Sequence, residues 1–455
     1  MNTNTHIRFI KELSILKECD IESKFISILK SKNILKYDIK NKNYYFNYVG
    51  LIELGNGNFL SILPKCIPQE IIDNNINLCE KYTKNILKAI EKYTKSNSEE
   101  IFSNLENKGI EDNYNLFTLY NFLINDYLDY GFYSENSEIY EKDGNNEIDW
   151  DYTLNYENSY LNEKKKPLYL NYYSLTSKNK DYSLIQEIHK FFLNKASNYF
   201  KKIYFILPKP ILNFYSKIEE HHINEKIIYM LEKLLSKTFN QRKIRLLKVF
   251  ILLLNKETHS QSKEINLYGI RYFHILWEDI CKIVFNDLYS NSTSYKNIMK
   301  KFTKPKYFFY DNSKNKLNTK PMIPDVVTRY KDTFIIIDAK YYNISIQNSD
   351  ADENNIDIIN EESSFLPGTY DVLKQFIYME TFLKDETLEI NLKKAKNVFI
   401  IPSTKDIHLG RVEMGLYSEK YIDIYFMEMD KALELYLMNQ LNIKLLDKIV
   451  KETIF

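Results

Sequence analysis

The chain has 455 residues, 44% of them hydrophobic, and a formal net charge of +1. This length predicts two or three domains, and the apolar content is ample for buried cores. A charge so close to zero gives no overall signal for nucleic-acid binding, so any basic surface has to be local. The longest apolar run, Val249 to Leu254, is far too short to span a bilayer.

The cysteines and the start of the chain bear on the compartment. Four cysteines are scattered without CxxC spacing, which argues against structural zinc and fits a reducing environment. No apolar segment at the start resembles a signal peptide. We therefore expect a soluble, cytoplasmic protein that makes no contact with a membrane.

The first strong structural signal lies in residues 44–65. Two apolar runs flank Gly55-Asn56-Gly57, a pattern typical of a β-hairpin. A GxxxxG spacing runs from Gly50 to Gly55, but Asn56 and Gly57 stand where a P-loop needs Lys and Ser or Thr. The sequence has no Walker A motif, and we do not expect the chain to be a self-contained NTPase.

Helical periodicity dominates residues 70–130 and 180–255. Between them, residues 145–173 hold short extended pieces that form either a small sheet or an ordered loop. We divide the chain into an N-terminal α+β region with the β-hairpin (1–130), a central extended segment with a helical section (131–260), and a C-terminal α/β domain (261–455).

The C-terminal domain begins with a helix, because Phe273, Leu276, Trp277 and Ile280 follow the i, i+3, i+4, i+7 spacing. The elements expected after it, in an α-β-β-β-α-β order, include a hairpin of 322–329 and 334–337 around a turn at 330–332, a helix at 370–380, a strand at 397–402 and a last amphipathic helix at 430–451.

The predicted hairpin brings charged side chains together. Asp338 and Lys340 stand two apart at the end of a strand, so they project from the same face. The hairpin returns Asp325 towards that pair. Two carboxylates and a lysine at a strand end suit Mg²⁺-dependent phosphodiester hydrolysis, because Mg²⁺ prefers hard oxygen ligands and acidifies a bound water. The alternative is a surface aspartate near a turn beside an ordinary Asp–Lys pair.

The sequence Pro324-Asp325, twelve residues, then Asp338-Ala339-Lys340 resembles the PD-(D/E)xK nuclease motif. The resemblance implies a C-terminal PD-(D/E)xK nuclease fold with an α-β-β-β-α-β core, preceded by the α+β region and the helical section. It also implies catalytic roles for Asp325, Asp338 and Lys340. In such nucleases the preceding helix commonly presents one glutamate to the metal. Glu278 resembles it, with Asp279 as the competing residue, so the implied metal ligands are Asp325, Asp338 and Glu278.

The helix at 370–380 is similar to the helix of RecB-like nucleases that carries a glutamine after the catalytic lysine. There the glutamine and a tyrosine are four apart, whereas Gln375 and Tyr378 are three apart and Lys374 and Tyr378 are four apart. Both spacings keep the residues on one helix face. The resemblance implies a catalytic role for Gln375, with Lys374 as the alternative.

Two charged segments flank the motif. Residues 295–320 carry eight lysines against one acid, Asp311. They form either a solvated face or a contact surface for DNA phosphates. Residues 350–362 carry six acids and no base, which is typical of a mobile insertion.

Asp338 to Asn343, followed by Pro367-Gly368 and Lys374-Gln375, resembles the LlaJI-type restriction endonuclease family, which is similar to McrC, the nuclease subunit of modification-dependent restriction. Further likeness lies in Tyr48 to Ile52 with Ile62 to Lys65, and in Glu147 to Trp150. The resemblance implies a Mg²⁺-dependent DNA endonuclease subunit of a phage-defence restriction system. It would act on double-stranded DNA beside a McrB-like AAA+ GTPase, with GTP only on that partner.

Two other functions stay open on the sequence. One is a stand-alone type II restriction enzyme or DNA-repair nuclease with the same site. The other is a non-enzymatic adaptor of an AAA+ partner, although the intact Asp325, Asp338 and Lys340 argue against a lost site.

Overall fold

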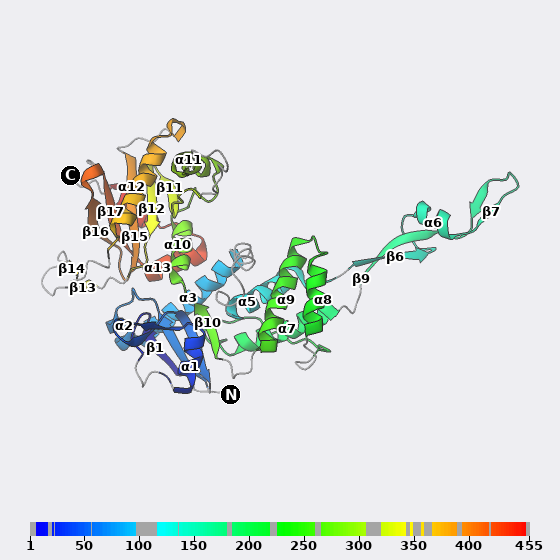
Figure 1. Ribbon diagram of the computed structural model, residues 1–455, viewed down its shortest axis with the longest axis horizontal. Helices are drawn as coiled ribbons and strands as arrows, with labels where there is room; N and C mark the ends of the chain where they lie inside the picture. The colour runs from blue at the N-terminus through cyan, green and yellow to red at the C-terminus, as the bar shows by residue number, and fades with distance from the viewer. Residues whose placement is uncertain are drawn as a thin grey trace, which may run out of the picture. The chain divides into compact units, whose positions relative to one another are not determined.

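The computed structural model describes residues 6–16, 21, 23–55, 57–96, 116–134, 136–179, 184–218, 225–259, 265–305, 320–342, 346–348, 356–358, 366–388, 394–417 and 420–451. The described residues fall into two compact units. The first takes those within 1–101, 111–118 and 264–455, and the second takes those within 102–110 and 119–263. Figure 1 shows their helices and strands coloured along the chain.

A four-stranded sheet forms the N-terminal part of the first unit, in the order β1-β5-β4-β10. The predicted hairpin around Gly55-Asn56-Gly57 is confirmed, since β4 and β5 pair in antiparallel fashion across it. β1 adds in parallel to β5, and β10 pairs with β4 from more than two hundred residues further along the chain. The bounds are β1 (His6–Lys11), β4 (Val49–Gly55), β5 (Asn58–Leu63) and β10 (Asn266–Ile270).

Two glycines allow β4 and β10 to approach closely. Gly50 pairs with Gly269 in the antiparallel register. A Cβ on Gly50 would lie 2.4 Å from the carbonyl oxygen of Tyr268, and one on Gly269 would lie 2.3 Å from that of Val49. Gly50 also has a φ of +138°, which side chains rarely adopt. Only glycine therefore fits at position 50, because a side chain there would collide with β10 and the backbone conformation is unfavourable for other residues.

The remaining elements of this part surround the sheet. A buried cluster that includes Leu29, Phe46 and Leu60 forms its core. The elements are α1 (Ser23–Ser31), a small hairpin of β2 (Leu35–Asp38) and β3 (Asn43–Phe46), α2 (Gln69–Asn74) and the long α3 (Ile76–Ser96).

A five-stranded sheet organises the C-terminal part of the same unit, in the order β11-β12-β15-β17-β16. β12, β15 and β17 run parallel, while β11 and β16 are antiparallel edge strands. β12 is buried along its whole length, as its apolar run predicts. The bounds are β11 (Val326–Tyr330), β12 (Thr333–Ala339), β15 (Ala395–Ser403), β16 (Ile407–Glu413) and β17 (Tyr421–Glu428).

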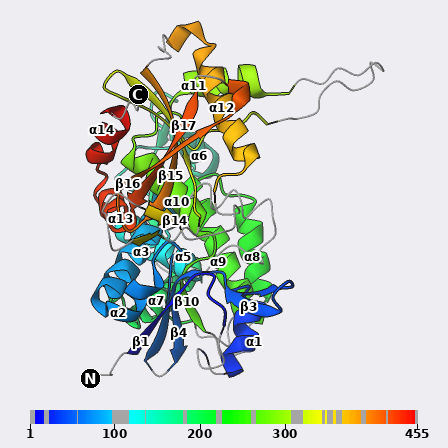
Figure 2. The ribbon, with the colours of Figure 1, turned by 90° about the vertical axis from the view of Figure 1, so that its left-hand side faces the viewer.

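Helices cover both sides of this sheet. In Figure 2, α11 and α12 lie on one side of the strands and α13 and α14 on the other. Phe334 and Ile336 of β12 pack with Phe382 of α12 in one core cluster. Because side chains alternate along a strand, residues 334, 336 and 338 all face α12. The bounds are α10 (Phe273–Val284), α11 (Thr293–Thr303), α12 (Thr369–Leu383), α13 (Met429–Met438) and α14 (Ile443–Lys451), with short 3₁₀ turns at Glu386–Leu388 and Gly415–Tyr417.

The predicted hairpin, the strand at 397–402 and the helices at 273–284 and 370–380 are confirmed, but two expectations differ. Within the described residues only β11 and β12 join the sheet between α10 and α12, not three strands. The short strands β13 (Ile346–Asn348) and β14 (Ile356–Ile358) pair with each other instead. The single last helix expected at 430–451 is two helices, because Asn439 adopts a left-handed conformation (φ 54°) that ends α13.

The second unit combines helices with two narrow β-ribbons. The helix α5 (Leu116–Tyr130, whose first residues belong to the first unit) lies in the helical region predicted at 70–130. The helices α7 (Leu184–Lys201), α8 (Glu225–Leu235) and α9 (Gln241–His259) confirm the helical periodicity predicted at 180–255. The ribbons are β6 (Asn136–Lys142) with β9 (Tyr173–Asn179), and β7 (Ser159–Leu161) with β8 (Pro167–Tyr169). Part of the region read as extended is a helix, α6 (Trp150–Tyr156), because the Asp149 side chain caps its first turn.

Several features of the sequence lie wholly or mostly outside the described residues. They include most of the acidic segment 350–362 and the lysines at 306, 314 and 316. None of the helices in the described part of the chain combines the length and apolar character that a bilayer crossing requires.

Candidate active site

The β11–β12 hairpin brings Asp325 beside Asp338. Tyr330 pairs with Thr333 across the two-residue turn Lys331-Asp332, and this register sets Val326 opposite Ile337. The Asp325 carboxylate then accepts a hydrogen bond of 2.9 Å from the main-chain N–H of Ala339. Asp338 projects next to it and is only 1% exposed. The two carboxyl groups therefore share one buried corner at the end of β12.

The two carboxyl groups strongly affect each other. Burial raises the pKa of Asp325 well above its usual range, and the adjacent Asp338 raises it further through its negative charge and a hydrogen bond. The two negative charges in this corner repel each other, and a bound cation would offset that repulsion.

Lys340 lies between two acids. Its ammonium is 2.8 Å from Oδ2 of Asp338 and 2.7 Å from Oδ1 of Asp371 on α12. Burial lowers the pKa of Lys340, but the charges and hydrogen bonds of these two carboxylates outweigh it and raise the net pKa above the usual range. Lys340 is therefore a charged group with a defined position at neutral pH.

Asp371 and Tyr342 complete the surroundings of Lys340, and the sequence analysis missed both. The Tyr342 hydroxyl donates a 3.1 Å hydrogen bond to Oδ2 of Asp371. Partial burial raises the pKa of Asp371, but Lys340, Tyr342 and Lys374 together lower it, so the net pKa lies below its usual value. The sequence did indicate that Asp371 shares a helix face with the predicted site residue Gln375, because it stands four residues before it.

Glu278 and Asp279, adjacent on α10, face different surroundings. Burial raises the pKa of Glu278, with a smaller increase from the negative charge of Asp338. Glu278 in turn raises the pKa of Asp325, so its carboxyl group lies within electrostatic reach of both aspartates. Asp279 instead accepts a 2.6 Å hydrogen bond from the Tyr436 hydroxyl of α13.

Gln375 and Lys374, adjacent on α12, also have different surroundings. The Gln375 side chain is fully buried and donates to the carbonyl oxygens of Ile336 (3.1 Å) and Val398 (3.4 Å), so it ties α12 to β12 and β15. The Lys374 ammonium lies 5.5 Å from the ring centre of Tyr378. Its positive charge lowers the pKa values of Glu278, Asp325 and Asp371. The Lys374 charge thus acts on the acidic groups, whereas Gln375 links α12 to the sheet within the core.

The donor set fits a divalent cation only in part. Two carboxylates, Asp325 and Asp338, converge with Glu278 nearby, and Asp338 Oδ2 is buried without a hydrogen bond although it pairs with the Lys340 ammonium. Mg²⁺ often binds through one or two carboxylates and keeps several waters. Among the described residues, however, no group of three or more acidic, histidine or cysteine side chains is arranged to hold a metal ion by itself.

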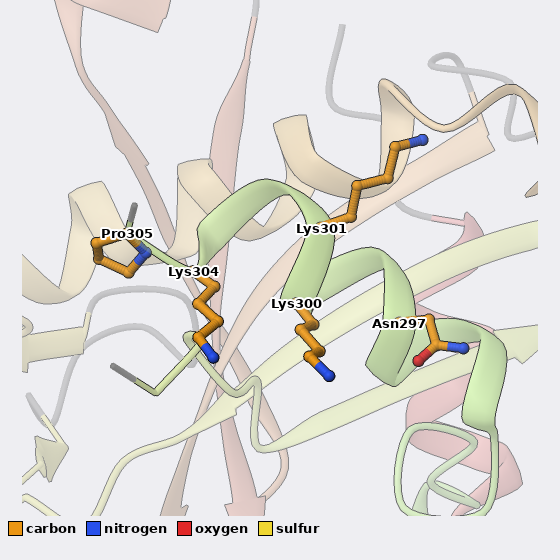
Figure 3. A pocket seen from close by; sticks show the side chains of 5 residues that line it. All are labelled: Asn297, Lys300, Lys301, Lys304 and Pro305. Atoms are coloured by element: carbon orange, nitrogen blue, oxygen red, sulfur yellow. The ribbon is translucent and has the colours of Figure 1, made fainter. Parts of the chain in front are cut away.

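A lysine-rich surface on α11 lies in the same unit. Lys300, Lys301 and Lys304 line a shallow hollow with Asn297 and Pro305. Figure 3 shows Lys300 and Lys304 extending to the same side of the helix and Lys301 to the other. Lys301 is 3.6 Å from Asp385, whereas no ion pair of Lys300 or Lys304 occurs within the described ranges. We call Lys300 and Lys304 the α11 lysine pair.

The sequence profile of the LlaJI restriction endonuclease family matches residues 48–439. The chain belongs to this family. The match extends across both units, from the Val49-Gly50 hairpin to α13, and includes every residue of the candidate site.

Relatives of this LlaJI family chain have been described. "Type II restriction enzyme BsuMI component YdjA" of Bacillus subtilis (strain 168) is 28% identical over 431 residues, which cover 91% of this chain and 85% of the relative. A chain in the solved half-complex of Thermococcus gammatolerans McrB AAA+ hexamers with bound McrC is 12% identical, covering 95% of this chain and 99% of that chain at a TM-score of 0.36.

Proposed function

We propose that the chain is the Mg²⁺-dependent DNA endonuclease subunit of a phage-defence restriction system, with a PD-(D/E)xK nuclease site in its C-terminal part. The observation that carries the proposal is the convergence of Asp325, Asp338 and Lys340 at the end of β12 in a member of a restriction endonuclease family. A buried acidic pair beside a charged lysine is typical of sites that hold a cation and a phosphate.

Each residue of the site has a proposed role. Asp325, Asp338 and Glu278 would hold Mg²⁺, whose charge would offset the repulsion between these carboxylates. When bound, Mg²⁺ offsets charge on the scissile phosphate and acidifies a water molecule. Lys340 keeps its proton at neutral pH because Asp338 and Asp371 raise its pKa. It would therefore donate hydrogen bonds to the attacking water or to a phosphate oxygen and would not remove a proton.

The proposed substrate is double-stranded DNA. Supporting observations are the family membership and the α11 lysine pair, which lies on a helix that carries no acid. Phosphate contacts from such lysines provide affinity that is independent of base sequence.

We also propose a McrB-like AAA+ GTPase as the partner. The full sequence has no Walker A motif, so any nucleotide-driven step would require another subunit. A second candidate is a component of a type II restriction enzyme without a GTPase, and the printed name of the Bacillus subtilis relative favours it. GTP dependence of DNA cleavage by the assembled system separates the two, because only the first would lose cleavage when GTP is withheld.

The decisive variant is Asp338→Ala, assayed with purified partner subunits, Mg²⁺ and plasmid DNA. We expect cleavage to fall by at least about a hundredfold while the thermal unfolding midpoint and partner binding are kept, because only a metal ligand at the end of β12 is lost. Asp332→Ala is the matched control, since its side chain is 79% exposed at the turn of the same hairpin. Wild-type cleavage by Asp338→Ala would show that the site assignment is wrong.

A further inference from the structure

Lys340 begins a short extended segment, Lys340 to Tyr342, that follows β12. The main-chain N–H of Lys340 donates a 2.9 Å hydrogen bond to the carbonyl of Ile400 in β15. The side chains of Lys340 and Tyr342 both reach Asp371 on α12. Because side chains alternate along an extended chain, Tyr341 points to the opposite side.

Tyr341 reaches the N-terminal sheet. Its hydroxyl donates a hydrogen bond to Oε2 of Glu12 and accepts one of 3.2 Å from the main-chain N–H of Lys65. The Lys65 ammonium lies 4.3 Å from the centre of the Tyr341 ring, and the Phe273 ring packs 5.2 Å from it. We call Glu12, Lys65 and Tyr341 the Tyr341 anchor.

The N-terminal sheet presents this anchor on adjacent parallel strands. β1 and β5 run side by side, Glu12 follows the first, and Lys65 lies two residues beyond the second. The main-chain N–H of Glu12 continues the ladder with a 2.8 Å hydrogen bond to Leu63. Glu12 is only 5% exposed, so its carboxylate has lost most of its water and depends on the Tyr341 hydroxyl and the Lys65 N–H.

The charge states favour a durable hydrogen bond. Burial raises the pKa of Tyr341 well above its usual range, so the phenol keeps its proton and remains a donor at neutral pH. Burial also raises the pKa of Glu12, while Tyr341 and Lys65 lower it. The anchor is therefore a buried contact between the segment after β12 and residues that follow β1 and β5, more than 270 positions earlier in the chain.

We propose that Tyr341 is a positioning residue for Lys340, and this rests on the nuclease function proposed above. Asp371 holds the Lys340–Tyr342 segment from one side and the Tyr341 anchor holds it from the other. With both contacts, the Lys340 ammonium has one position relative to Asp338. Without the anchor, the segment stays attached on the α12 side only, and the ammonium departs from the geometry that the reaction requires.

The test removes the hydroxyl alone, with Tyr341→Phe in the full-length chain. The remaining ring keeps its packing against Phe273 and Lys65. Hydrogen–deuterium exchange of the peptide covering residues 338–342 should become faster by about tenfold or more, a readout that needs no cleavage. In the assembled system with Mg²⁺ and plasmid DNA, kcat should fall about ten- to a hundredfold with KM changed less than about twofold.

Glu12 variants test the same hydrogen bond from its acceptor side, in case Tyr341→Phe does not fold. Glu12→Gln keeps an oxygen acceptor and should retain exchange and kcat near wild type. Glu12→Ala removes the acceptor and should match Tyr341→Phe, and the double variant should be no worse than either single one. Tyr436→Phe is the matched control, because it also removes a tyrosine–carboxylate hydrogen bond, with Asp279, but on α13.

The outcomes separate this inference from the proposed function. Unchanged exchange at residues 338–342 in Tyr341→Phe, or an equal kcat loss in Tyr436→Phe, would overturn the positioning role even if the wild type cuts DNA. Equal inactivity of the wild type and Asp338→Ala would overturn the nuclease function while the exchange experiment still reports on the anchor. Faster exchange with a selective loss of kcat supports the inference.

Discussion

Asp325 and Asp338 place two carboxyl groups side by side at the end of β12, where the Asp338 side chain is almost fully buried. Burial and the mutual repulsion of the two charges raise the pKa of Asp325 above its value in the unfolded chain. The folded state then binds more protons than the unfolded state between these two pKa values. The stability of the metal-free protein therefore falls as the pH rises from about 4 through this window.

Asp325→Asn should remove that dependence. The neutral amide has no charge to bury, so the metal-free variant should be more stable than the wild type at pH 8 and similar to it near pH 4. Each unit of raised pKa corresponds to about 1.4 kcal/mol of unfolding free energy. Denaturant unfolding in EDTA at several pH values measures this, with cleavage lost in parallel. A variant less stable than the wild type at pH 8 would contradict it.

Glu278 and Asp279 are neighbours in sequence with different contacts. Glu278 lies within electrostatic reach of Asp325 and Asp338, whereas Asp279 binds the Tyr436 hydroxyl. Glu278→Gln should reduce cleavage by about a hundredfold with little change in stability. Asp279→Asn should leave cleavage within about twofold and cost about 1 kcal/mol of stability, because a hydrogen bond to a charged group becomes neutral. The reverse pattern in a plasmid-cleavage assay would transfer the role to Asp279.

At the scale of single elements, α12 carries several functions on one helix. Asp371 fixes Lys340, Gln375 bonds the carbonyls of two strands, and the Tyr378 hydroxyl donates a 2.7 Å hydrogen bond to the carbonyl of Ile323 just before Asp325. One helix thus contacts both chain segments that bring the aspartates together. Asp371, Gln375 and Tyr378 are four and three residues apart, so they share one face of α12 without the i, i+4 spacing of the glutamine and tyrosine in the RecB-like pattern.

The helix α11 should carry part of the DNA affinity. Replacing the α11 lysine pair, as Lys300→Glu with Lys304→Glu, should weaken binding of a random-sequence duplex and reduce the slope of log K against log salt by about 2. Lys84→Glu with Lys88→Glu on α3 makes the same change of charge at the same spacing and serves as the control. Fluorescence anisotropy at several salt concentrations provides the slopes. Equal losses in both double variants would mean that only net charge matters.

At the scale of the whole molecule, the chain returns to its first unit after forming the second. The N-terminal sheet is completed by β10, and the next element, α10, carries Glu278. The N-terminal sheet and the part of the chain proposed to cut DNA are therefore in one compact unit. The Tyr341 anchor is a direct contact between them.

The division of labour with a partner predicts that the purified chain alone neither binds nor hydrolyses GTP or ATP. A phosphate-cradling loop with its lysine is missing from the sequence, so the β- and γ-phosphates would find no nest of N–H groups. Isothermal titration with a non-hydrolysable GTP analogue should show no heat above dilution. GTP or ATP hydrolysis by the purified chain that persists after contaminating NTPases are removed would refute the proposal.

Features that depend on neighbouring residues could be predicted from the sequence. Alternation and helical periodicity are local, so the β4–β5 and β11–β12 hairpins, α10 and α12 could be predicted, as could the shared face of Asp338 and Lys340. Contacts between residues far apart in the sequence became visible only in the folded chain. Asp371 beside Lys340, Glu12 beside Tyr341 and β10 beside β4 all depend on strand register and packing between segments far apart in the chain. Many carboxylates satisfy the same local pattern, and only the folded core selects the ones that lie within a few ångströms.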